Sequence, residues 1–213
     1  MPPGYRHRRP VLAALALSAC AAASAGEPVH YAIDPVHTRV MFEIDHAGFS
    51  KAIGTLSGSQ GHLEFDENDW STARLDVTLP MQRLDMGDSG WSASVFAPRF
   101  LDVERHPQAR FVSTRVERLA DNRGSVCGEF TLRGVTRPLC MQFKLNRIAR
   151  YPLPPFRRTA GFSATATLKR SDYGITAWQS LIGDEIDLRI EAELTRSGGD
   201  DHRDAPAAPP AAH

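Results

Sequence analysis

Histidine and cysteine side chains could ligate a metal ion, and the sequence holds eight His and three Cys. Three of the His lie near the chain ends. The other five are far apart, and neither two His nor a Cys and a His stand at the short spacing typical of metal ligands. These five are His30, His37, His46, His62 and His106. The sequence therefore predicts no metal site.

Signatures of nucleophilic catalysis are also missing from the sequence. It contains neither a G-x-S-x-G motif nor a Gly-rich phosphate loop. The Gly58-Ser59-Gln60-Gly61 segment interrupts a strand-like region and is interpreted as a bulge or turn. Neighbouring carboxylates such as Asp184 and Glu185 fall in predicted turns, where they are solvated. We therefore expect no catalytic residues and no enzymatic activity.

Cys127 and Cys140 form an even pair once Cys20 is assigned to the N-terminal segment. Two strand-like runs, 126–132 and 139–145, flank residues 133–136. Facing residues of an antiparallel hairpin have numbers with a constant sum, and the sum of 267 centres the turn on Arg133 and Gly134. A four-residue loop at residues 133–136 would instead give a sum of 269, which corresponds to an offset of one residue on each strand. The two Cys face each other or nearly so, which predicts a disulfide; two buried free thiols are the alternative.

Both ends of the chain are expected to lie outside the folded domain. Residues 1–25 combine a basic start, an apolar run too short to span a bilayer comfortably and Ala23-Ser24-Ala25, the pattern of a cleaved signal peptide. Alternatively, Leu17-Ser18-Ala19-Cys20 is a lipobox that makes Cys20 the lipidated first residue. Residues 26–196 form the predicted domain. Residues 197–213, rich in Gly, Pro, Ala and Asp, are predicted to be a disordered tail.

The charge balance argues against two classes of partner. The chain has 25 basic and 25 acidic residues, and removing the three Arg of residues 1–25 leaves 22 basic against 25 acidic. This balance excludes the basic footprint of a nucleic-acid-binding protein. It also provides no polybasic patch for anionic lipid headgroups.

Apolar and polar residues alternate with period two along most of residues 27–196. The clearest stretch places Ile186, Leu188 and Ile190 on one face, against Asp187 and Arg189 on the other. About eight such strands are predicted, each with one apolar face, as in an all-β sandwich or barrel. Small residues at Ala164 and Ala166 leave room inside, and eight strands suffice for a barrel that holds one small ligand.

Residues 88–105 break this alternation and predict a single helix. Trp91, Val95 and Phe96 have the spacing of one helical face. Asp88 or Ser89 could cap its N-terminus, and Pro98 ends it. The helix either forms a lid over the barrel mouth or plugs one end of the barrel.

The inward residues of these elements are the candidate lining of an apolar channel. They are Val40, Phe42, Ile44, Val77, Leu79, Phe143, Phe162, Ala164 and Ala166 on strands, with Trp91, Phe96 and Phe100 near one opening.

Several segments in order resemble the YceI-like family of exported bacterial proteins. The resemblance begins at residues 31–37 with His37 and Thr38, and continues through His46, Gly54 and residues 63–66. It extends over residues 100–107, 128–138, 170–175 and 183–185, and so covers nearly all of residues 31–195. This resemblance implies an eight-stranded antiparallel, lipocalin-like β-barrel around a channel for a polyisoprenoid or similar lipid. Pro152–Pro155, Trp178 and the Cys pair depart from the family pattern and bear on ligand length and mouth geometry.

Together these observations favour an exported lipid-binding protein. Its expected ligand is a polyprenyl phosphate, an isoprenoid quinone or a quinone precursor, and no cofactor is required. The expected location is the periplasm. Tethering to the outer membrane through a lipidated Cys20, and a homodimer, are open alternatives. An enzyme acting on the lipid within the barrel, or a structural stress-response module with a filled barrel, are the other interpretations.

Overall fold

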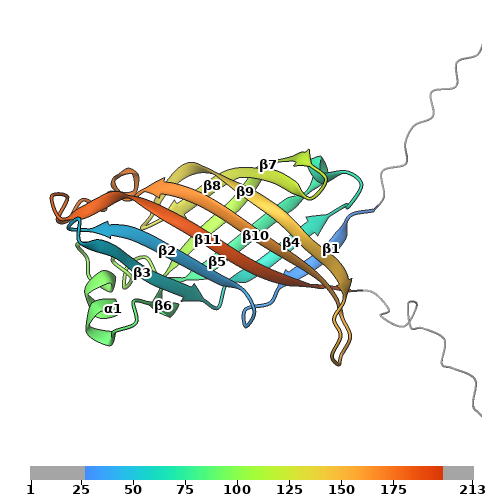
Figure 1. Cartoon of the computed structure of the whole chain (residues 1–213), viewed down its shortest axis with the longest axis horizontal. Coiled ribbons are helices and arrows are strands. Elements are labelled where there is room, and N and C mark those ends of the chain that lie inside the picture. Colours follow the sequence, from blue (N-terminus) through green and yellow to red (C-terminus); the bar gives the residue numbers. More distant parts are fainter. Residues whose placement is uncertain (1–26, 199–213) are drawn as a thin grey trace, which may run out of the picture.

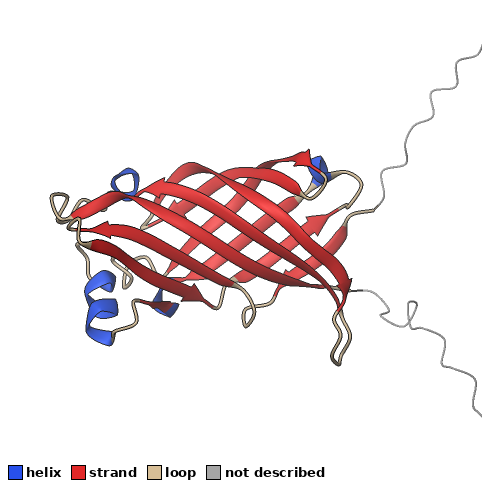
Figure 2. Ribbon diagram, viewed as in Figure 1, coloured by secondary structure: helices blue, strands red, loops and turns tan. Residues whose placement is uncertain are grey.

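The alternating stretches form β-strands in the computed structural model, which describes residues 27–198 (Figure 2). Most apolar residues of the strands point inward and most polar residues point outward, with Ile53 of β3 and Leu119 of β7 as exposed exceptions. The strands are β1 (Val29–Ile33), β2 (Arg39–His46), β3 (Ser50–Ser57), β4 (Gln60–Phe65), β5 (Arg74–Pro80), β6 (Leu84–Asp85), β7 (Gln108–Ala120), β8 (Arg123–Leu132), β9 (Val135–Arg150), β10 (Arg158–Lys169) and β11 (Ile182–Arg196). The helices are η1 (Trp70–Thr72), η2 (Met81–Arg83), α1 (Ser89–Phe96) and η3 (Arg170–Tyr173).

These strands close into a barrel (Figure 1). The hydrogen-bonded ring runs β1-β4-β5-β7-β8-β9-β10-β11, and β11 closes it by pairing with β1. β2 pairs with β11 along the same edge as β1, β3 pairs with β2, and β6 pairs with β3. β2, β3 and β6 therefore continue the barrel wall beyond the ends of β1, β4 and β5. All pairings are antiparallel. The prediction of an eight-stranded antiparallel barrel with one short helical insertion is confirmed.

Two breaks divide the first long hairpin of the barrel. Between β1 and β2, the Asp34 carboxylate accepts hydrogen bonds from the backbone N–H groups of Val36 and His37, at 2.8 and 3.1 Å. Gly58 lies between β3 and β4, and Gly61 is the second residue of β4; both have positive φ. A Cβ on Gly61 would lie 2.0 Å from the carbonyl oxygen of Asp76, so only Gly fits there. The segment 58–61 is thus a local break in the strand, as interpreted from the sequence.

The β8–β9 hairpin has the register that the cysteine spacing predicted. Arg133 and Gly134 both have positive φ and form a two-residue turn. Cys127 therefore faces Cys140, with a Cα–Cα distance of 4.0 Å, and the two are joined by a disulfide. The predicted pairing is confirmed, and the bond lies toward the outer surface of the barrel.

Helix α1 follows the short strand β6 at one end of the barrel, which we call the α1 end (Figure 1). The Asp88 carboxylate caps it by accepting a hydrogen bond from the Trp91 N–H at 2.8 Å. Ala97 is already extended and Pro98 follows, so the helix ends where the sequence predicted. The turn between β2 and β3 and the loop between η3 and β11 lie at the same end. Both ends of the described chain leave the barrel at the opposite end (Figure 1).

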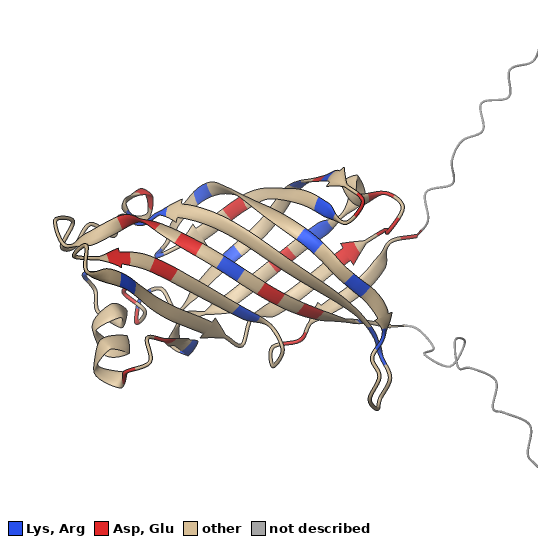
Figure 3. Ribbon diagram, viewed as in Figure 1, with Lys and Arg blue, Asp and Glu red and all other residues tan. Residues whose placement is uncertain are grey.

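Charged residues recur along the barrel strands (Figure 3). Ion pairs join neighbouring strands, for example Arg110 of β7 with Asp76 of β5, and Lys51 of β3 with Glu43 of β2. The inner faces hold the apolar residues. This inside–outside division is what the period-two pattern encodes.

Some predictions concern residues beyond 27–198. The proposed signal peptide, Cys20, Gly26 and residues 199–213 of the tail lie outside the described residues. Within the described part of the chain, none of the helices has the length and apolar character needed to cross a bilayer.

Candidate ligand-binding cavity

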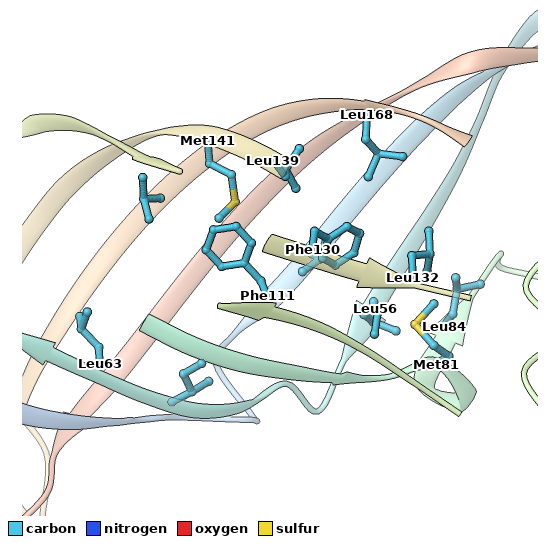
Figure 4. Close-up of a cluster of buried hydrophobic side chains, with 14 of the residues drawn as sticks. Leu56, Leu63, Met81, Leu84, Phe111, Phe130, Leu132, Leu139, Met141 and Leu168 are labelled. Carbon is cyan, nitrogen blue, oxygen red and sulfur yellow. The ribbon is translucent and has the colours of Figure 1, made fainter. Parts of the chain in front are cut away.

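The barrel encloses a cavity of about 440 Å³, a size typical of sites for small molecules. Its wall is built from apolar side chains of the barrel strands. Figure 4 shows ten of them, from Leu56 and Leu63 on one wall to Leu139, Met141 and Leu168 on another, directed toward the same interior space. Small residues in the wall, among them Ala52, Ala109 and Ala164, leave part of that space open.

Most residues expected from the alternation lie on this wall. They are Val40, Phe42, Ile44, Val77, Leu79, Trp91, Phe100, Phe143, Phe162 and Ala164. The Phe42 ring crosses β3 at Gly54, where a Cβ would lie 2.3 Å from it. Gly54 therefore makes room for an aromatic side chain in the cavity.

Two expected residues are corrected by the structure. Ala166 is on the inner face of β10, but β10 pairs with β9 only as far as Thr165 and Gln142. Beyond this point the two strands separate, and Ala166 borders a groove on the outside of the barrel that also includes Cys140. Phe96 packs against the core but is not part of the cavity wall, because α1 directs Trp91, Ser94 and Val95 toward the cavity instead.

Sequence reasoning also missed part of the wall. Leu63, Phe111, Phe130, Leu139 and Met141 lie on strands whose alternation could have placed them there. Met81, Leu84 and Met86 lie in or beside η2 and β6, which are too short to show a period. Trp178 and Ile175 come from the loop after η3, for which no pattern predicts an orientation.

An aromatic cluster fills the barrel at the end opposite α1. Phe65, Trp70, Phe143 and Phe162 contact one another with ring centroids 5.5 to 6.1 Å apart. Trp70 belongs to η1 and is 3 % exposed, and its indole N–H donates to the carbonyl oxygen of Glu67. The guanidinium of Arg118 lies 4.9 Å from the centre of the Trp70 ring. These contacts seal this end of the cavity.

The cavity opens at the α1 end. Trp91 and Trp178 line it and yet are 39 % and 53 % exposed, so the two rings stand at its mouth. Trp91 contacts the ring of His46, and Trp178 contacts Phe100 edge to face at 5.6 Å. The structure thus combines a sealed aromatic end with an aromatic mouth.

Few polar groups border the cavity, and most of them are engaged. The Thr38 hydroxyl bonds to the backbone of Glu193, and the Ser94 hydroxyl donates to the carbonyl oxygen of Gly90. The Ser59 hydroxyl is buried and has no hydrogen-bond partner among residues 27–198. Among the described residues, the Ser59 hydroxyl inside the barrel and the rings of His46, Trp91 and Trp178 at the mouth therefore have hydrogen-bonding groups to offer a ligand.

Arg170 is a charged group at the cavity wall, and its role is structural. Its guanidinium donates to four carbonyl oxygens of residues 175–183, at 2.7 to 2.9 Å. Burial lowers the pKa of Arg170, while the carboxylate of Asp184 acts to raise it. Asp184 in turn accepts hydrogen bonds from the backbone and hydroxyl of Ser171. This network fixes the loop that carries Trp178.

A second polar cluster lies on the outer surface. The Asp34 carboxylate accepts a hydrogen bond from His37 Nδ1 at 2.8 Å. This bond raises the pKa of His37, which is exposed. Burial alone would raise the pKa of Asp34, but His37 and the two backbone N–H groups hold it below its ordinary value. Within residues 27–198, no three His, Cys, Asp or Glu side chains gather closely enough to hold a metal ion.

Comparison with known proteins identifies relatives of this barrel. Residues 31–194 match the model of the YceI-like domain. A protein of Pectobacterium atrosepticum named as a UPF0312 protein is 30 % identical over 191 residues, which cover 89 % of this chain and 98 % of the relative. The crystal structure of Burkholderia cenocepacia BcnA superimposes with a TM-score of 0.68 at 18 % identity, over 76 % of this chain and 98 % of that one. A domain from Saccharophagus degradans, described as polyisoprenoid binding, gives a TM-score of 0.61 at 10 % identity, over 79 % and 99 %.

Proposed function

The chain belongs to the YceI-like family, and from this premise we propose that it is an exported binding protein for a long apolar lipid. The proposed ligand is an isoprenoid quinone, a quinone precursor or a polyprenyl phosphate, held with its chain inside the barrel. One solved relative by fold is described as a polyisoprenoid-binding domain, which supports this ligand class. We propose no catalytic step.

The observation that carries the proposal is the cavity, whose wall is almost entirely apolar and which the exposed rings of Trp91 and Trp178 border at the α1 end. Each methylene that leaves water contributes about 0.8 kcal/mol, so one five-carbon isoprene unit contributes about 4 kcal/mol before the costs of association. A chain of a few units can therefore bind without polar contacts. The aromatic rings around the cavity suit the flat double bonds of such a chain.

The distribution of polar groups sets the orientation of the ligand. Among the described residues that line the cavity, Ser59 has the one hydroxyl without a partner, whereas the mouth offers the rings of His46, Trp91 and Trp178 and access to water. A charged headgroup inside the barrel would lose its hydration without gaining partners. We therefore place the chain of the ligand inside and its headgroup at the mouth.

Mass spectrometry of the native protein tests this function. Protein purified from its own host, under gentle conditions, should carry a lipid that organic extraction releases and that contains isoprene repeats. The same protein stripped of lipid should recover the mass when mixed with an extract of host membranes. A protein that carries no lipid from either source would refute the proposal in favour of a filled structural barrel.

Export and anchoring rest on residues 1–25. We propose a periplasmic location, with a lipid on Cys20 as one of the two processing routes. If the lipobox is used, Cys20→Ala blocks processing or releases the protein from detergent into the aqueous phase. A mature protein that starts at Gly26 would instead establish ordinary secretion.

A further inference from the structure

Three segments surround the cavity mouth at the α1 end, and we call them together the mouth rim. They are residues 46–50 between β2 and β3, residues 89–98 of α1 and its end, and residues 174–182 before β11. The Ala47 N–H donates to the carbonyl oxygen of Leu181, which joins the first and third segments. The contact between His46 and Trp91 joins the first and second. The rim is therefore one continuous surface.

Large apolar side chains of this rim point into water. Phe49 is 93 % exposed and Leu181 is 55 % exposed, beside the half-exposed rings of Trp91 and Trp178. Trp178 adopts a positive φ of 53°, which is unfavourable for a bulky side chain. The guanidinium of Arg99, 4.9 Å from the centre of its ring, and the edge of Phe100 hold it in this position. Several exposed apolar side chains in one patch are typical of a binding surface.

The mouth rim also carries no formal charge. Its 24 residues contain no Asp, Glu, Lys or Arg, and Figure 3 shows α1 free of charged residues along its length. Charged residues make up 23 % of the chain, so a segment of this size would on average contain about five. The nearest carboxylates have local roles: Asp45 accepts from the Gly48 N–H and Asp88 caps α1. One cation, the exposed guanidinium of Arg99, borders the rim where it stacks on Trp178. The rim itself is thus matched to an uncharged, apolar partner.

We propose that the mouth rim docks onto the interfacial layer of a lipid bilayer. Trp residues favour this layer, because their rings are apolar and their N–H groups reach water or headgroups. Phe49 and Leu181 would enter the acyl region, and no carboxylate would be forced out of water. Because Trp91 and Trp178 belong to both the rim and the cavity wall, a lipid chain could pass from the bilayer into the barrel without crossing water. The exchange of ligand rests on the proposed function, whereas docking itself does not.

The opposite end of the barrel provides a matched control. The hairpin between β9 and β10 exposes Leu153 and Phe156, but Arg157 and Arg158 follow directly. Docking by this hairpin would require anionic lipid and would weaken at high salt. Docking by the mouth rim should occur on uncharged phosphatidylcholine vesicles and persist at high salt.

Vesicle flotation tests the proposal on protein with Cys20→Ala, which excludes a lipid anchor. Mass spectrometry first checks that the signal peptide has been removed from this protein. Phe49→Ser and Leu181→Ser alter the rim without touching the cavity wall, and each should reduce partitioning into phosphatidylcholine vesicles by about tenfold. Leu153→Ser and Phe156→Ser should leave it unchanged.

Loss of partitioning in the hairpin variants alone, or a requirement for phosphatidylglycerol at low salt, would overturn the proposal and assign docking to the hairpin. A dimer that dissociates on Phe49→Ser, without any vesicle binding, would overturn it in favour of a second copy of the chain. Native mass spectrometry of the same rim variants, loaded with lipid from detergent, reports the cavity separately. If these mass spectra show no bound lipid, the proposed function is refuted, regardless of whether the protein binds vesicles.

Discussion

Replacing Ala164 by Phe should obstruct the cavity while leaving the barrel folded. Ala164 lies on β10 directly between Phe143 of β9 and Ile190 of β11, and all three side chains line the cavity. The new ring would project into the open space between the walls. Ala166 is unsuitable for the same test, since it borders the outer groove.

The expected change in stability is small, because two effects oppose each other. Burying the added ring contributes about 1.5–3 kcal/mol, and fitting it against existing side chains costs about 1–3 kcal/mol. The free energy of unfolding should therefore change by no more than about 1–2 kcal/mol. For a domain of this size that is a shift in Tm of about 2–8 °C.

The expected loss of affinity is much larger. The six ring carbons exclude about as many carbons of the ligand, each worth about 0.8 kcal/mol. The total of about 5 kcal/mol corresponds to more than a thousandfold weaker binding. Binding should thus be lost well before folding is affected.

The assay combines thermal unfolding with measurement of co-purified lipid for the wild type and two variants. Thr165→Phe is the control, because Thr165 is the next residue on the same strand and is exposed on the outer side. It should bind lipid like the wild type. A fall in Tm above about 10 °C for Ala164→Phe, in a protein whose wild type carries no lipid, would show a filled core. Unchanged lipid content in a folded Ala164→Phe protein would show that the ligand lies elsewhere.

Three further predictions concern the scaffold. Cys127 and Cys140 should resist thiol labelling in denatured, unreduced protein, and labelling of both would contradict the disulfide. Changing both to Ser should lower the free energy of unfolding in urea by about 3 kcal/mol or less, because the loop that the disulfide closes is short. Arg170→Met leaves one buried and three partly buried carbonyl groups without their donor and should cost at least about 3 kcal/mol in the same assay. A loss below about 1 kcal/mol would contradict the role assigned to Arg170. Asp34→Asn should lower the pKa of His37 toward 6.5 in an NMR titration, because the carboxylate is the main cause of its elevation. Since the folded pKa of His37 is raised, its contribution to stability is complete below pH 6.5 and declines as the pH rises through the folded value; an unchanged pKa in the variant would refute the assignment.

The sequence predicted the barrel well because alternation is a local signal. Each alternating stretch shows on its own which face is buried, and the eight predicted stretches cover most of the sheet, although β1 was not among them. The breaks in the long strands were harder to place. They depend on the Asp34 turn and on Gly61, whose missing Cβ avoids a backbone from another strand, and neither contact is visible in one stretch of sequence.

The cavity could be predicted only in part, for a related reason. Alternation assigns a face to a residue but does not show whether neighbouring strands stay paired. Ala166 therefore has the expected orientation and still lies beside a gap in the wall. Arg170 and Trp178 come from a loop whose shape is set by hydrogen bonds to its carbonyl groups. Those bonds follow from the tertiary structure, which one sequence does not show.

The positions of the chain ends determine how a tethered molecule would face its surroundings. The start of β1 and the end of β11 both lie at the end of the barrel opposite α1 and the mouth (Figure 1). A lipid on Cys20, seven residues before Glu27, would hold that end within about 25 Å of its membrane. The mouth would then point away from the anchoring leaflet and toward whatever lies across the gap. An anchored copy would collect its cargo from the facing membrane, whereas an unanchored copy could shuttle between the two.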